Sequence, residues 1–459
     1  MLIEFKVENF LSYNEMTSFS MVAGKERIST ETLASVKKFR LKLLPVAAIY
    51  GANASGKSNL IKALEFLQLL VTTPRLKGKI PLRSFCFTEE KKTVSKFEIS
   101  ILVNELIYEF KIACSENEIL YEELIERNSR TERTLYVRDK DQVQVNPGLK
   151  AHDAIQLIAE RSKDNPYPLL TSLCAMKFEL FQPVFKWFAE DLQIIFPDSF
   201  YLSYDRLTDV NDPRNALLSE ILKGTDTGIS NLVSVPIEAT SVNLSPSEKS
   251  EIRAAVSNGR NQVIREPNGG RILAYYKDGD VAFKRIIAIH DVSGKEYPVA
   301  LEDESDGTRR LIDLSPSIAD LIHGNEHSVY VIDEIDRSLH SDINLWLITK
   351  FLENLTPESR SQLIFTTHDT NLLRRINLRR DEIWFVERGK DSSSHLINAS
   401  EFEGLRNDSS LQKLYEEGRF GAIPNIIGHI LIVRQANDWF SPSRQYAGSA
   451  FNLSFHASY

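Results

Sequence analysis

The first third of the chain contains repeated runs in which apolar and polar positions alternate, which is the pattern of β-strands. Such runs predict strands over residues 2–13, 16–22, 96–103, 106–113, 119–127 and 134–145. Asn104-Glu105 separates two of these runs and predicts a tight hairpin. We therefore expect a β-rich lobe within residues 85–145.

Helical periodicity replaces the strand pattern near residue 150. Apolar positions recur at helical spacing over residues 151–162, 178–196 and 245–259. Ser245 suits the N-cap of the last helix, because Pro246 follows it and Glu248 lies three residues on. No heptad repeat is sustained, so we expect a mainly helical insertion over residues 150–270 without a long coiled-coil arm.

Strands return after residue 270, over residues 271–276 and 281–290. Strands and helices then alternate to about residue 390, which is typical of the α/β class, in which helices cover a parallel sheet. The last segment, residues 434–459, has little periodicity and is rich in Ser, Asn and aromatic residues. A flexible end and a docking segment are both consistent with this tail.

A phosphate loop stands between a predicted strand and a predicted helix. Residues 51–58 match the pattern GxxxxGK[ST] at every fixed position. Lys57 is expected to reach the β- and γ-phosphates of a nucleotide, and Ser58 to bind Mg²⁺ through its hydroxyl. Backbone N–H groups of the loop are expected to surround the phosphates, at Asn53, Ala54, Ser55 and Gly56. The alternative is a chance match at a strand–helix turn.

Two carboxylates follow an apolar strand over residues 328–332. Asp333 is expected to hold Mg²⁺, and Glu334 to orient or deprotonate the attacking water. A parallel sheet would place both beside the phosphate loop, because the carboxyl ends of its strands share one edge. The alternative is a strand followed by an ordinary acidic turn.

Two further segments can contact phosphate groups. His368 follows the apolar strand 362–366 and can hydrogen-bond a γ-phosphate. Ser305 and Gly307 precede a predicted helix, whose N-terminus suits a phosphate. The acids around Ser305 argue against an anion site, so an ordinary helix cap is the alternative there.

Composition places the chain among ordinary globular proteins, with 459 residues, 42% of them hydrophobic and 26% charged. The net charge of −8 does not require a nucleic-acid partner, although DNA binding through a local basic face stays open. Four arginines cluster within residues 374–380 and are expected on a solvated surface.

The three cysteines are widely spaced, and the sequence has neither a signal-peptide pattern nor an apolar run long enough to span a membrane. We therefore expect a cytoplasmic protein without a membrane partner.

Other chemistries are less well supported. His323 and His327 could share a helix face for a metal, but Gly324-Asn325 between them reads as a turn. No GxSxG elbow is present. A two-metal nuclease would need carboxylates beyond Asp333 and Glu334, and the candidates by density, Glu302, Asp303, Glu304 and Asp306, are expected to form a solvated loop instead.

The order of these motifs resembles that of ATP-binding-cassette ATPases of the SMC, RecF and OLD type. Residues 7–13 are similar to the N-terminal strand of that group, and Ser338-Leu339-His340 stands at the position of its D-loop. The layout is similar to compact ATPases commonly encoded in bacterial anti-phage and toxin–antitoxin-like systems. Among these, the ATPase component of PARIS-type systems is the nearest resemblance.

The resemblance implies an ATPase head in two parts, residues 1–149 with the phosphate loop and β-rich lobe, and residues 271–433 with the remaining motifs. It implies that ATP and Mg²⁺ bind between two copies of the chain, in a homodimer or higher oligomer. Ser305 and Gly307 of one copy would then face the phosphate loop of another. The implied function is an anti-phage switch that hydrolyses ATP slowly and controls a separate effector encoded nearby, such as a nuclease toxin.

Two alternatives stay open. One is a DNA-binding ATPase of the RecF type in DNA repair, and the other is an ATP-binding scaffold with negligible turnover. A departure from the family pattern keeps the scaffold open, because the glutamine of the Q-loop is not identifiable. Gln68 lies within the helix that follows the phosphate loop, and residues 85–87 contain no glutamine.

Overall fold

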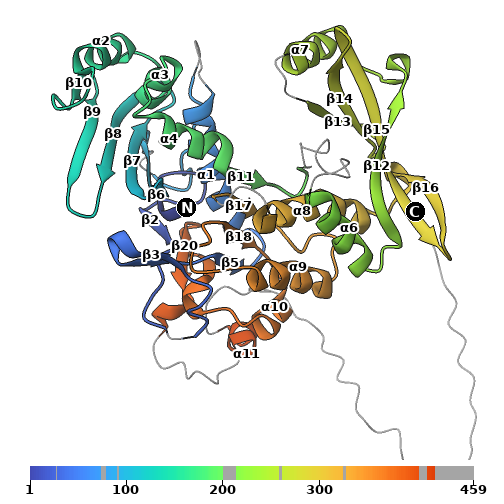
Figure 1. Ribbon diagram of the computed structural model, residues 1–459. Coiled ribbons are helices and arrows are strands. Elements are labelled where there is room, and N and C mark those ends of the chain that lie inside the picture. The colour runs from blue at the N-terminus through green and yellow to red at the C-terminus, as the bar shows by residue number, and fades with distance from the viewer. Residues whose placement is uncertain are drawn as a thin grey trace, which may run out of the picture. The chain divides into compact units, whose positions relative to one another are not determined.

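Three large β-sheets and the helices on them form most of the computed structural model (Figure 1). The residues that it describes are 1–26, 28–73, 79–89, 92–199, 213–257, 261–323, 327–402 and 411–418. Residues 1–423 group into one compact unit. The predicted tail 434–459 and the turn at Gly324-Asn325 lie outside the described residues.

The first sheet, which we call the core sheet, confirms the predicted α/β class. Its strands in spatial order are β11 (Leu192–Ile195), β17 (Val329–Ile332), β18 (Gln362–Thr366), β5 (Val46–Gly51), β19 (Ile383–Arg388) and β20 (Ser394–Asn398). All neighbours are parallel except β19 and β20, which pair antiparallel. The phosphate-loop strand β5 therefore lies in the middle of the sheet, beside β18.

Both faces of the core sheet are covered. On β5, Ala47 and Ile49 belong to the hydrophobic cluster that contains the buried side of α1 (Lys57–Thr72). Tyr50 belongs to a second cluster with the helices of the other face. Those helices are α8 (Asp306–His323), α9 (Ser341–Glu353), α10 (Thr370–Arg375) and α11 (Leu411–Glu416), joined by α6 (Pro213–Gly224) (Figure 1). Burial on both faces explains why β5 reads as a continuous apolar run.

The second sheet, the lobe sheet, is antiparallel and holds the predicted β-rich lobe. Its strands in order are β10 (Gln142–Val145), β9 (Glu132–Asp139), β8 (Ile119–Arg127), β7 (Leu106–Cys114), β6 (Ser95–Val103), β1 (Leu2–Glu8) and β2 (Thr17–Ser20). The predicted hairpin is confirmed, since Val103 pairs with Leu106 and both turn residues have positive φ. The run 134–145, expected as one strand, is divided into β9 and β10 by a turn.

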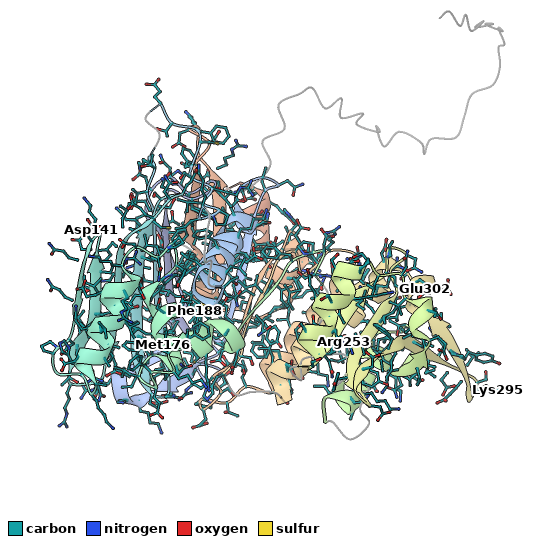
Figure 2. The ribbon with its side chains drawn as sticks, turned by 90° about the horizontal axis from the view of Figure 1, so that it is seen from above. Asp141, Met176, Phe188, Arg253, Lys295 and Glu302 are labelled. Atoms are coloured by element: carbon teal, nitrogen blue, oxygen red, sulfur yellow. The ribbon has the colours of Figure 1, made fainter. Side chains whose placement is uncertain are left out.

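Helices pack on the lobe sheet through one shared hydrophobic cluster. They are α2 (His152–Ser162), α3 (Leu169–Ala175) and α4 (Gln182–Lys186). Figure 2 labels Met176, just after α3, and Phe188, which is buried in that cluster. A short hairpin of β3 (Ala34–Val36) and β4 (Leu41–Leu43) completes the N-terminal part.

The third sheet, the insertion sheet, begins within the segment expected to be mainly helical. Its strands are β12 (Ile229–Ile237), β15 (Asp280–Val292), β14 (Arg271–Lys277) and β13 (Gln262–Arg265) in order, with β16 (Lys295–Ala300) beside β15. Helix α7 (Pro246–Ser257) packs on it. The predicted cap is present, because Ser245 Oγ accepts from Glu248 N at 3.3 Å and Ser245 N donates to Glu248 Oε2 at 2.8 Å. Arg253 on this helix is labelled in Figure 2.

Two local predictions are wrong in part. Residues 178–196 were expected to be helical, but a π-helical turn, Trp187–Asp191, ends the helix and residues 192–195 form β11. The arginine cluster was expected on a solvated surface. Arg374 and Arg375 are exposed, but Arg379 is fully buried and donates to both carboxylate oxygens of Asp381, at 2.9 and 2.6 Å. Burial is tolerated because each guanidinium contact is paired.

Among the described residues, no helix combines the length and apolar character needed to cross a membrane.

Candidate nucleotide-binding site

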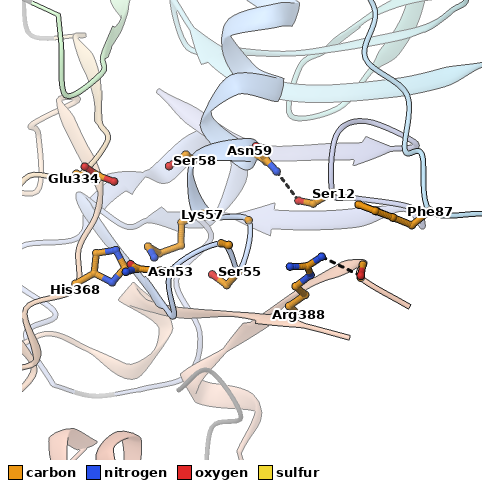
Figure 3. A pocket seen from close by; sticks show the side chains of 13 residues that line it. Ser12, Asn53, Ser55, Lys57, Ser58, Asn59, Phe87, Glu334, His368 and Arg388 are labelled. Atoms are coloured by element: carbon orange, nitrogen blue, oxygen red, sulfur yellow. Dashed lines mark hydrogen bonds between the residues drawn. The ribbon is translucent and has the colours of Figure 1, made fainter. Parts of the chain in front are cut away.

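A cavity of about 480 Å³ lies where the phosphate loop meets the ends of its neighbouring core strands (Figure 3). Residues 53–59 line it, together with Ser12, Phe87, Glu334, His368 and Arg388. The structure thus brings Glu334 and His368, from two strands distant in sequence, to the predicted phosphate loop. A polar cavity of this kind suits the phosphates of a nucleotide.

Lys57 is buried at the start of α1 and is bonded within its own loop. Its Nζ donates to Gly51 O at 2.7 Å and to Ala52 O at 3.1 Å. Burial lowers the pKa of Lys57 to about 8, against the opposing effect of nearby carboxylates such as Asp333. A phosphate would exchange these two carbonyl partners for anionic oxygens, which form stronger hydrogen bonds with an ammonium group.

Hydroxyl groups of neighbouring segments donate hydrogen bonds to carbonyl oxygens of the phosphate loop. Tyr13 Oη donates to Gly56 O at 3.1 Å, and Ser394 Oγ donates to Ser55 O at 2.5 Å. Ser394 also contacts Ser12 Oγ at 2.7 Å. Gly56 has φ +114°, and a Cβ there would overlap the hydroxyl oxygen of Ser394, so both the backbone conformation and the packing require glycine.

The predicted Mg²⁺ ligands lie beside each other. Ser58 Oγ donates to Asp333 Oδ1 at 3.1 Å, although 275 residues separate them in the sequence. A hydroxyl and a carboxylate are the hard oxygen donors that Mg²⁺ prefers, so these residues fit the cation. The contact places the end of β17 directly at the start of α1.

Thr366 organises the two acidic residues and was not found by sequence reasoning. Its Oγ1 donates to Asp333 Oδ1 at 2.7 Å and accepts from Glu334 N at 2.7 Å. Glu334 has φ +49°, a left-handed conformation that a non-glycine residue adopts only where its surroundings enforce it. Thr366 supplies part of that constraint.

His368 lines the cavity, and Figure 3 shows its ring and the Lys57 side chain pointing toward the same space. Its backbone N–H donates to Asp336 Oδ2 at 3.1 Å. Partial burial, and then the charge of Lys57, lower the pKa of His368. A neutral imidazole at neutral pH can donate one hydrogen bond to a γ-phosphate.

Ser305 and Gly307 do not line the cavity. Ser305 is exposed at the start of α8, where its Oγ accepts from Thr308 N at 3.1 Å, as an ordinary helix cap does. Gly307 packs so closely against the loop after β17 that an added Cβ would lie 2.7 Å from Ser338 O. Within one copy of the chain, this pair is therefore separate from the phosphate loop.

The cavity differs from the family pattern in two ways: Gln68 does not supply the Q-loop glutamine, and an arginine lines the cavity. Gln68 is not a nucleotide ligand, because its Nε2 donates to Phe188 O at 2.8 Å and to Leu192 O at 2.7 Å, which ties α1 to β11. Arg388, which no motif marked, lines the cavity with its guanidinium carbon 5.9 Å from the ring centre of Phe87. It gives the cavity a second cation.

We expect Thr366→Val to lower the rate of ATP hydrolysis by about tenfold to a hundredfold, which corresponds to roughly 1–3 kcal/mol for a buried partner left unsatisfied. The valine keeps the shape but removes the hydroxyl shared by Asp333 and Glu334. Steady-state release of phosphate measures the rate, and Thr366→Ser, which retains the hydroxyl, is the matched control. Equal rates for the valine variant and the parent would show that Thr366 does not position these acids.

ATP affinity should fall as the pH rises. Burial lowers the pKa of Lys57 to about 8, whereas the negative charge of a triphosphate would favour the charged form of the lysine. Between pH 7 and 9 the free lysine loses its proton, so we expect the dissociation constant to rise by about tenfold. Titration calorimetry measures the dissociation constant at each pH. The control is Lys62→Ala on the same helix, which should retain the pH dependence of the parent protein. A flat profile in the parent protein would contradict this origin.

Comparison with known proteins gives one family and matches to many solved structures, two of which are described below. The family model described as "AAA domain, putative AbiEii toxin, Type IV TA system" matches residues 46–374. No curated protein matches the chain. The SMC head domain from Thermotoga maritima matches at 15% identity with a TM-score of 0.34, over 86% of this chain and 98% of that one. The recombination mediator protein RecF with ATP matches at 12% identity with a TM-score of 0.32, over 86% and 97%.

Proposed function

Because this chain belongs to the AAA-domain family whose model spans residues 46–374, we propose that it binds and hydrolyses ATP as a molecular switch. The observation that carries the proposal is the contact of 3.1 Å between Ser58 Oγ and Asp333 Oδ1. It joins the phosphate loop to the acidic end of β17, as hydrolysis of a bound nucleotide requires.

The residues of the site have separate proposed roles in hydrolysis. Lys57 and the loop N–H groups bind the β- and γ-phosphates, and His368 contacts the γ-phosphate. Ser58 and Asp333 would hold Mg²⁺, which supplies positive charge against the phosphates when it is bound. Glu334 accepts a proton from the attacking water, because it is the carboxylate that lines the cavity.

We infer further that the complete site needs two copies of the chain. Ser305 is exposed and Gly307 lies at the start of α8, away from the cavity of their own chain. A second copy could present this helix start to the triphosphate. ATP would then lie between the two copies and hold them together.

Ser305→Arg tests this assembly. We expect ATP binding to stay within about twofold of the parent and hydrolysis to fall by about a hundredfold, because a long cation would block the second copy. Titration calorimetry measures binding, phosphate release measures turnover, and mass photometry with ATP and Mg²⁺ measures assembly. Ser247→Arg on α7, also exposed, is the control. Undiminished turnover with Ser305→Arg would contradict the composite site.

The partner of the switch is proposed to be an effector protein encoded nearby, in a bacterial defence system. The family description, which names a putative toxin of a type IV toxin–antitoxin system, supports this setting. Co-purification of the neighbouring gene product, released or retained according to the bound nucleotide, tests it. Stimulation of hydrolysis by DNA, without such a partner, would favour a DNA-repair ATPase instead.

A further inference from the structure

A second pocket, about 170 Å³ in volume, shares no lining residue with the nucleotide cavity. It lies beside the first turns of α8, the loop after β11, and the loop after β17. We call it the arginine pocket, after the five arginines that line it: Arg265, Arg271, Arg309, Arg310 and Arg337. Three aspartates also line it, Asp198, Asp306 and Asp313, so cations exceed carboxylates by two (5 − 3).

The three carboxylates are already engaged. Each forms an ion pair with a different arginine, Asp313 with Arg271 at 2.8 Å, Asp306 with Arg309 at 2.6 Å, and Asp198 with Arg337 at 3.1 Å. The other two guanidinium groups have only backbone oxygens as partners among the described residues. The surplus charge of the pocket therefore belongs to Arg265 and Arg310.

Arg310 is the more unusual of the two, because it is only 5% exposed. Its terminal nitrogens lie 3.4 Å from the carbonyl oxygens of Phe196, Pro197 and Asp333, which is long for a hydrogen bond. Its Nε has no hydrogen-bond partner at all among the described residues. Burial lowers the pKa of Arg310, and nearby carboxylates, Asp313 first among them, oppose this effect only in part.

A buried guanidinium with few hydrogen-bond partners, at the wall of an open pocket, lowers the stability of the protein unless an anion pairs with it. We propose that the arginine pocket binds a phosphate group. The planar fork of arginine matches the oxygens of phosphate, and Arg265 at the rim can approach the same group. The pocket is much smaller than the nucleotide cavity, which suits one phosphate rather than a whole nucleotide.

The phosphate can come from the backbone of a nucleic acid or from a free phosphate compound, and both present the same chemistry. Either one would affect the ATPase site, because Arg310 contacts the carbonyl oxygen of Asp333. An anion that draws Arg310 toward the pocket would weaken this contact. Its binding is therefore expected to change the rate of ATP hydrolysis.

The test uses the full chain carrying Lys57→Ala, which is expected to weaken phosphate binding in the nucleotide cavity by about a hundredfold. Inorganic phosphate is titrated calorimetrically, and a fluorescent single-stranded DNA of 20 nucleotides is titrated by anisotropy, each at two salt concentrations. We expect phosphate to bind this protein, and the added pair Arg265→Gln and Arg337→Gln, both at exposed positions, to weaken binding by about tenfold. Arg310→Gln should weaken it as well, but the exposed pair keeps the test valid if that variant fails to fold.

Arg253→Gln is the matched control, because Arg253 is an exposed arginine of α7 outside the pocket (Figure 2). DNA that competes with phosphate and binds more weakly at high salt would identify a nucleic-acid source, whereas phosphate binding without DNA binding would identify a free phosphate compound. The proposal is overturned if phosphate does not bind, or if the pocket variants bind it as well as the Arg253→Gln control.

Discussion

Glu334→Gln is expected to reduce ATP hydrolysis by about 10²- to 10⁴-fold, the usual contribution of a general base. Glutamine keeps the size of the side chain and the backbone bond from Glu334 N to Thr366 Oγ1, but it cannot accept the proton of water. ATP binding should persist, because the residue does not belong to the phosphate loop. The variant should therefore accumulate ATP-bound assemblies, which mass photometry and single-turnover kinetics would detect together.

The control for this experiment is Glu353→Gln, at an exposed position of α9. It removes one carboxylate of the same type without touching the cavity. If Glu334→Gln hydrolysed ATP at the parent rate, another group would have to activate the water. Loss of ATP binding in the same variant would point instead to a distorted cavity.

Lys57→Ala should weaken ATP binding by about a hundredfold, since two charge-assisted hydrogen bonds contribute roughly 1.5 kcal/mol or more each. The expected loss concerns affinity and, through it, turnover. The same change removes the bonds from Nζ to Gly51 O and Ala52 O, so thermal unfolding must be measured beside binding. Lys62→Ala, at an exposed position of α1, should retain parent affinity.

Two outcomes distinguish the possible roles of Lys57. A folded variant with weak ATP binding would agree with a direct contact to phosphate. A folded variant with parent affinity would refute that contact, and the lysine would then serve only to hold the empty loop.

Sequence reasoning succeeded where the signal is local or follows from strand direction. The phosphate loop, its strand β5 and its helix α1 form a contiguous pattern. The approach of Asp333 to Ser58 followed from the shared edge of parallel strands. The roles in hydrolysis that were assigned to Glu334 and His368 remain predictions for the experiments above.

The features that were not predicted depend on tertiary contacts, which produce no periodic pattern in the sequence. Thr366 and Ser394 act through single hydroxyl groups, whose partners lie on other strands. Strand β11 was taken for helix because a short apolar run fits either structure, and its pairing with β17 decides the outcome. The burial of Arg379 was not predicted, because the sequence does not indicate that Arg379 and Asp381 form a buried ion pair.

The position of β5 between β18 and β19 has a consequence for synthesis of the protein. The strand ends at residue 51, but its two neighbours are contributed by residues 362–388. On the ribosome, both edges of this apolar strand stay without their native partners until most of the chain has been translated. Such distant pairings make folding slow and leave the nascent chain open to aggregation, so a truncated product should be unable to form the nucleotide site.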